Sequence, residues 1–158
     1  MRKLSLFLDT NVVLDAFIAQ RPLSKEANTI LINGYLNAFN LFVSASQITD
    51  FLFIAGGGGN KAKSTEAVDW LKKELKSFSI AETNPEDIVD MLNCDWRDYE
   101  DYLVYATALR YDCDLLITRN GSDFSKSQIP VMNEREFLDW YEKEYNIRYS
   151  LEDFANAY

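Results

Sequence analysis

Four aspartates stand next to short apolar segments that predict buried strands, or on the helices that adjoin those segments. They are Asp9, Asp50, Asp101 and Asp123. Clustered carboxylates repel one another unless protons or cations lie between them. Hard divalent ions such as Mg²⁺ prefer oxygen ligands and leave part of their coordination shell to substrate phosphates. If the fold brings these four side chains together, we expect a metal site that acts on a phosphate-containing substrate.

The composition narrows the chemistry further, because the 158-residue chain contains no histidine and only two cysteines, Cys94 and Cys113. Histidine triads, HExxH zinc hydrolases, C2H2 zinc fingers and imidazole-dependent ribonucleases are thereby excluded. Two cysteines supply neither a zinc site nor a disulfide framework. An oxygen-only donor set favours Mg²⁺ or Mn²⁺ over zinc, so any catalysis must rest on carboxylates.

The charge balance argues against strong general binding of nucleic acid. Sixteen basic and 25 acidic residues give a net charge of −9, the opposite of the basic surface typical of such proteins. The acids concentrate between Asn84 and Asp101, where seven of them accompany a single base, Arg97. We expect this segment to attract a cation, and we expect substrate binding to be weak and dependent on shape.

Apolar segments alternate with amphipathic ones along the chain. Strands are predicted at residues 4–8, 41–43, 78–81, 115–117 and 130–132, and helices at 12–18, 24–39, 46–55, 64–76, 98–111 and 133–144, with a further helix start at 83–87. This alternation predicts a three-layer α/β/α sandwich with a central parallel sheet of about five strands. Ligands of such sheets bind beyond the carboxyl ends of the strands, where the strand order reverses.

Length and hydropathy predict one domain over residues 1–145, followed by a tail at 146–158 whose role the sequence does not indicate. No apolar run approaches the roughly 18 residues of a membrane span. The N-terminal apolar run reaches Asp9 too early for a signal peptide. We therefore expect a cytoplasmic protein without membrane attachment.

Four segments resemble the motifs of the PIN domain, in the same order and spacing. They are FLDTNVVLDAF at 7–17, SASQITDFLFI at 44–54, DYEDYLVYATAL at 98–109 and LLITRNGSDF at 115–124. The resemblance extends over about residues 4–140. It is nearest to the bacterial VapC-like branch, whose members are mostly toxin ribonucleases of toxin–antitoxin pairs.

The resemblance implies that the four aspartates are the catalytic residues and the metal ligands. It further implies that three polar residues, Asn11, Thr118 and Asn120, support them. The second acid of the family is often glutamate, and the shorter Asp50 then binds the ion through water. Asp98 precedes Asp101 by three residues and shares its helical face, so it is a further candidate in the site.

By the same resemblance the protein is an Mg²⁺- or Mn²⁺-dependent endoribonuclease that leaves 5′-phosphate and 3′-hydroxyl ends. The implied partners are RNA, a second copy of the chain in a homodimer, and a cognate antitoxin that covers the cleft. Arg119 and Lys126 lie near Asp123 in the sequence and are candidates for contact with the substrate backbone. Solvated surface charge is the alternative interpretation of both.

Other interpretations of the same residues stay open. Asp9, Asp50, Asp98 and Asp101 could each only cap a helix or complement its dipole, and Asp123 could form an Asx turn. Asp15 is expected on a helix surface.

Two other classes of protein use similar residues. A haloacid dehalogenase-type phosphatase would need an acid where Asn11 stands. A non-catalytic PIN-like module that binds RNA or a protein is the more serious alternative, and metal dependence of RNA cleavage separates it from an enzyme.

Overall fold

Five parallel strands form one sheet in the order β3-β2-β1-β4-β5. The structure is a computed structural model that describes residues 2–147, so the predicted tail at 146–158 lies almost entirely outside the described residues. The strands are β1 (Ser5–Leu8), β2 (Asn40–Ser44), β3 (Ser79–Ala81), β4 (Leu115–Ile117) and β5 (Val131–Met132). The predicted fold class is confirmed, and each predicted strand is present within a few residues of its expected bounds.

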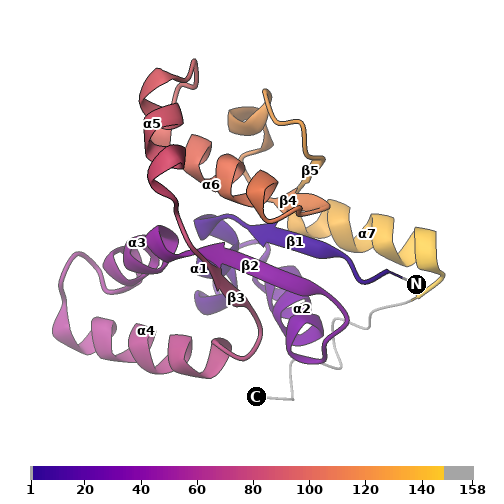
Figure 1. Cartoon of the computed structure of the whole chain (residues 1–158). Helices are drawn as coiled ribbons and strands as arrows, with labels where there is room; N and C mark the ends of the chain where they lie inside the picture. The colour runs from indigo at the N-terminus through magenta and orange to yellow at the C-terminus, as the bar shows by residue number, and fades with distance from the viewer. Residues whose placement is uncertain (1, 148–158) are drawn as a thin grey trace.

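The strand order reverses beside β1. From β1 the chain adds β2 and β3 on one side, and it then crosses back to place β4 and β5 on the other (Figure 1). Leu6 is in register with Leu41 of β2 and with Leu115 of β4. The carboxyl ends of β1 and β4 therefore meet at the switch point where ligands bind in sheets of this kind.

Seven helices and one 3₁₀ turn accompany the strands within the described residues, and all but α7 lie between strands. They are α1 (Thr10–Phe17), α2 (Ser24–Tyr35), α3 (Ala45–Ala55), α4 (Lys61–Glu74), α5 (Pro85–Asn93), α6 (Tyr99–Arg110), η1 (Gly121–Phe124) and α7 (Glu134–Tyr145). The second predicted helix ends at Tyr35 rather than at Phe39. Asn37 adopts a left-handed conformation with φ of 65°, and the chain turns there so that Phe39 enters the core at 1% exposure.

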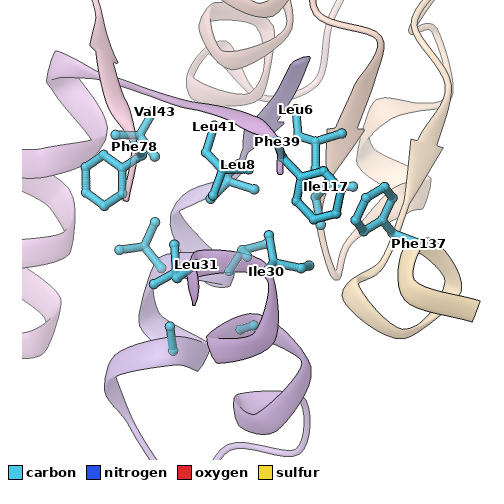
Figure 2. Close-up of a cluster of buried hydrophobic side chains, with 14 of the residues drawn as sticks. Leu6, Leu8, Ile30, Leu31, Phe39, Leu41, Val43, Phe78, Ile117 and Phe137 are labelled. Carbon is cyan, nitrogen blue, oxygen red and sulfur yellow. The ribbon is translucent and has the colours of Figure 1, made fainter. Parts of the chain in front are cut away.

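One face of the sheet packs against helices α1, α2, α3, α4 and α7. Figure 2 shows the centre of this core, where Leu8 and Leu41 of the strands face Ile30 and Leu31 of α2. Phe39 makes an edge-to-face contact with Phe137 of α7 at 5.3 Å between ring centroids. Val12 and Val13 of α1 belong to the same core, which holds α1 and its N-cap residue Asp9 at the end of β1.

The opposite face of the sheet packs against α6. Phe7 and Leu116 point to this side together with Val104 and Tyr105 of the helix. Trp96 stacks on Tyr105 with ring centroids 5.0 Å apart. Helices thus cover both faces of the sheet, and α5 projects beyond it beside α6 (Figure 1). Among the described residues no helix combines the length and the apolar character that crossing a membrane requires.

Candidate active site

Asp9 follows β1 directly and caps the first helix. Its Oδ1 accepts a hydrogen bond from the Thr10 amide at 2.7 Å, and its Oδ2 accepts one from the Thr118 hydroxyl at 2.8 Å. Asn11 forms a further hydrogen bond with it. Burial raises the pKa of Asp9, the Thr118 hydrogen bond opposes this rise, and the charge of Asp123 adds to it. The carboxylate is 6% exposed, so its orientation is determined by these contacts.

The loop after β4 brings Asp123 to the same end of the sheet. The hydroxyl of Thr118 also accepts a hydrogen bond from the Asn120 amide at 3.1 Å, and the Asp123 amide donates to the Asn120 carbonyl at 2.9 Å. Phe124 anchors the turn in the second core at 2% exposure. Asp123 therefore sits on a short, well-anchored turn rather than on a free loop.

The first turn of α6 contributes a group of acids. Asp98 caps the helix and accepts hydrogen bonds from the amides of Glu100 at 2.8 Å and Asp101 at 3.4 Å. Burial raises the pKa of Asp101 to about 6, with further contributions from Asp98, Asp9 and Asp123. Asp98, Asp9 and Asp123 thus lie close enough to Asp101 for their charges to interact with it. Of the four ligands that the sequence predicts, three (Asp9, Asp101 and Asp123) belong to this group.

Asp50 enters the same electrostatic group through a residue that the sequence analysis missed, Glu100. Burial raises the pKa of Glu100 to about 7, and the carboxylate of Asp50 is the largest charge that adds to the rise, followed by Asp98, Asp9 and Asp101. Gln47, three residues before Asp50 on α3, donates to the Leu8 carbonyl at 2.9 Å. Because residues three apart share a helical face, Asp50 lies on the side of α3 that faces the end of β1.

A cleft of about 760 Å³ opens beside these acids. Asp98, Asp101 and Asp123 are among its lining residues, together with Arg97 and Lys126. The remaining lining residues are Asp95, Trp96, Ser122 and Ser125. The cleft therefore combines acids that could hold a cation with two cationic side chains on its walls that could contact a phosphodiester backbone.

The two predicted substrate-contacting residues lie in different surroundings. Lys126 lines the cleft, where its ammonium group pairs with Asp95 at 2.8 Å. Arg119 instead donates from Nη1 to Asp15 at 3.0 Å. The expectation that Asp15 lies on a helix surface is wrong, since this residue is 0% exposed. A buried carboxylate requires paired donors, and Arg21 and Arg119 supply them.

The donor chemistry of the acidic group fits a hard divalent ion. All of its candidate ligands are carboxylates, and their mutual repulsion is what a cation removes. Within residues 2–147 no three acidic, histidine or cysteine side chains are grouped tightly enough to hold an ion as they stand. Ion binding would therefore draw the carboxylates of Asp9, Asp101 and Asp123 closer together.

Comparison with known proteins identifies the family of this chain. The model of the PIN domain family matches residues 5–122. The chain belongs to the PIN domain family. Of the acids described above, Asp9, Asp50, Asp98, Glu100 and Asp101 lie within the matched range of this PIN domain, and Asp123 follows directly after its end. Ribonuclease VapC1 of Aquifex aeolicus is 26% identical over 141 residues, which cover 88% of this chain and 96% of that protein.

Solved structures show the same PIN fold. FitAcB of Neisseria gonorrhoeae matches with a TM-score of 0.63 and 17% identity over 82% of this chain and 98% of that chain. VapBC2 of Rickettsia felis, bound to a DNA fragment from its promoter, matches with a TM-score of 0.61 and 13% identity, again over 82% and 98%. A toxin–antitoxin complex from Klebsiella pneumoniae has a TM-score of 0.56 and 24% identity over 82% and 97% of the two chains.

Proposed function

We propose that this PIN domain is an Mg²⁺- or Mn²⁺-dependent endoribonuclease that hydrolyses RNA phosphodiester bonds as the toxin of a toxin–antitoxin pair. The observation that carries the proposal is the interaction of acids from four separate segments at the switch point of the sheet. Charges of Asp9, Asp98 and Asp123 all raise the pKa of Asp101. Residues that only cap helices do not have to lie close enough to repel one another. Carboxylates that share a cation do.

Asp9, Asp101 and Asp123 are the residues that would hold the ion. Thr118 and Asn11 orient Asp9 by hydrogen bonds, so that its carboxylate is directed before the ion arrives. When bound, a divalent ion supplies electrophilic activation of water and of the scissile phosphate.

Asp50 and Glu100 lie at the edge of this group. Their charges interact, and the shorter side chain of Asp50 leaves it to act through water. Asp98 holds the first turn of α6 by capping it. This capping places Asp101 and Glu100 on the side of the helix that faces the other acids.

The cleft provides the side chains that could contact a substrate. Arg97 and Lys126 line it together with Asp101 and Asp123. Both can pair with backbone phosphates, while the net charge of −9 keeps non-specific attraction low. We therefore propose an RNA substrate that is selected by shape and by local contacts in the cleft.

The proposed protein partners are inferred from similarity to solved structures. The Klebsiella pneumoniae relative is a toxin–antitoxin complex, and the gonococcal and rickettsial relatives share its fold. We propose that this chain likewise binds an antitoxin that covers the cleft, and that it forms a homodimer. Light scattering on the purified chain, alone and with a co-expressed neighbouring gene product, tests both statements.

Cleavage of a mixed, end-labelled RNA tests the activity. We compare the unaltered protein with Asp9→Asn and Asp101→Asn, in Mg²⁺, in Mn²⁺ and in EDTA. The matched control is Asp139→Asn, which removes an exposed acid on α7 away from the cleft. We expect cleavage by the unaltered protein and the control only, and only with metal.

Two outcomes contradict the proposal. Equal cleavage by all four proteins would assign the activity to a contaminant. An unaltered protein that is inactive with every RNA and metal would favour the non-catalytic module that binds RNA or a protein.

A further inference from the structure

A buried ion-pair network lies around α1, and none of its residues lines the acidic cleft. Its centre is Asp15 on α1, six residues after Asp9 and 0% exposed. Arg21 donates from Nε to Oδ1 of Asp15, and Arg119 Nη1 lies 3.0 Å from Oδ1 and 3.4 Å from Oδ2. A buried carboxylate is tolerated when donors satisfy it in this way.

Each arginine is connected to a residue that holds Asp9. The Nη2 group of Arg21 donates to Asn11 Oδ1 at 3.4 Å, and Asn11 hydrogen-bonds Asp9. Arg119 directly follows Thr118, whose hydroxyl donates to Asp9 Oδ2 at 2.8 Å. Two routes thus lead from one buried carboxylate to the same catalytic candidate.

Glu134 closes the network from the side of α7. It is 0% exposed, and its carboxyl group lies near enough to Asp15 for that carboxylate to raise its pKa. As an ionised carboxylate it would find no donor for either oxygen from another described residue. A protonated Glu134 can donate a hydrogen bond from its O–H to Asp15. The other lone pairs of Asp15 then remain available to the arginines, and the two carboxyl groups carry one negative charge between them.

A second ion pair of the same chemistry provides an internal comparison. Arg135 Nε donates to Oε1 of Glu26 at 2.9 Å, and Glu26 is 5% exposed. This pair joins α7 to α2, and none of the hydrogen bonds that either side chain forms leads to Asp9. In both cases the carboxylate is buried, while the Arg135 side chain is 61% exposed and the Arg119 side chain 32%. If arginines that pair with buried carboxylates only stabilised the fold, neither pair would affect Asp9.

We propose that Asp15, acting through Arg21 and Arg119, is a positioning residue that holds Asn11 and Thr118 in place against Asp9. The proposal rests on the proposed function, because the orientation of Asp9 affects catalysis only if Asp9 binds the ion. Groups that orient metal ligands typically change metal affinity or activity by about 10- to 100-fold when they are removed.

The test compares Arg119→Gln with Arg135→Gln. Each change removes one guanidinium from a buried carboxylate, and neither arginine lines the cleft. We expect each variant to have a lower melting temperature than the unaltered protein. Only Arg119→Gln should weaken Mn²⁺ binding, measured by electron paramagnetic resonance, and lower kcat, each by about 10-fold or more, with KM for RNA unchanged. Arg119→Lys, which keeps the charge, should recover part of the loss.

Equal Mn²⁺ affinity and equal kcat in the two glutamine variants would overturn the proposal. If Arg119→Gln fails to fold, Arg21→Gln replaces it, because Arg21 holds the Asn11 route. If the unaltered protein neither binds Mn²⁺ nor cleaves RNA, the proposed function fails separately.

The positioning claim is then decided by hydrogen exchange in the metal-free protein. Faster exchange of the amides at 118–123 in Arg119→Gln, but not in Arg135→Gln, supports the claim. Unchanged exchange at these amides rejects it.

Discussion

The hydroxyl of Thr118 donates a hydrogen bond of 2.8 Å to Oδ2 of Asp9, across a separation of 109 residues in the chain. Adjacent parallel strands make this contact possible, because Asp9 and Thr118 each follow the last residue of their strand and β1 pairs with β4. The same hydroxyl accepts from the Asn120 amide at 3.1 Å. One buried side chain thus joins the first acid of the site to the loop that carries the last one.

Replacement of this hydroxyl is the first prediction. Thr118→Val keeps the shape of the side chain, which is 1% exposed, but leaves a buried carboxylate oxygen and an amide without their partner. We expect a loss of about 1–3 kcal/mol in the free energy of unfolding and a fall in RNA cleavage of about 10- to 100-fold. Thr118→Ser should restore most of both. Urea titration and cleavage assays measure them, and an active valine variant would show that the hydroxyl is dispensable.

Removing one of the repelling acids should stabilise the metal-free protein. Burial and three neighbouring aspartates raise the pKa of Asp101 to about 6. The ionised carboxylate is therefore less favourable in the folded state than in the unfolded chain. In EDTA at pH 7.5 we expect Asp101→Asn to melt about 2 °C or more above the unaltered protein, the shift that roughly 1 kcal/mol produces at this size. Saturating Mg²⁺ should raise the melting temperature of the unaltered protein more than that of the variant.

The control for this experiment is Asp139→Asn, whose side chain is exposed on α7. It should leave both melting temperatures unchanged. A destabilised Asp101→Asn in EDTA would mean that the carboxylate contributes more to the fold as a partner than it costs by repulsion.

Lengthening Asp50 should bring its carboxylate nearer to the ion. Asp50 lies in the middle of α3 and its charge interacts with Glu100, and one extra methylene extends its reach without changing its charge. We expect Asp50→Glu to keep or raise Mn²⁺ affinity and cleavage, and Asp50→Asn to lower both by about 10-fold or more. Isothermal titration with Mn²⁺ decides the matter, and equal affinities for the glutamate and asparagine variants would place residue 50 outside the metal site.

Ionisation of Glu134 should make the stability of the protein depend on pH. Burial and Asp15 raise the pKa of Glu134 to about 8 from 4.5, so the folded protein retains a proton that the unfolded chain has lost. Stability must therefore fall as the pH rises between these two values, with a slope of at most about 1.4 kcal/mol per pH unit. Glu134→Gln cannot ionise, and its amide N–H can still donate to Asp15.

Urea unfolding at several pH values from 5 to 9 checks this prediction. The unaltered protein should lose stability relative to Glu134→Gln as the pH rises, and the difference should level off above about pH 8. Glu144→Gln on the exposed side of the same helix is the control and should run parallel to the unaltered protein. Parallel curves for Glu134→Gln as well would show that this carboxyl ionises in the folded state as it does in the unfolded chain.

The amino-acid sequence by itself determined the layer architecture and the positions of the main acids, because both depend on local patterns. Short apolar segments and capping residues identify strands and helices one by one, and their alternation implies a parallel sheet with ligands beyond its carboxyl edge. The placement of Asp9 after β1 and of Asp101 in the first turn of α6 followed directly from these patterns.

Only the tertiary structure decided which charged residues meet. Glu100 faces Asp50 because α3 and α6 approach the same end of the sheet, and nothing in the local sequence distinguishes it from a solvated acid. Asp15 is buried because Arg21 and Arg119 arrive from two different loops. The burial of a charge depends on partners that are distant in the chain, and hydrophobic periodicity contains no information about them.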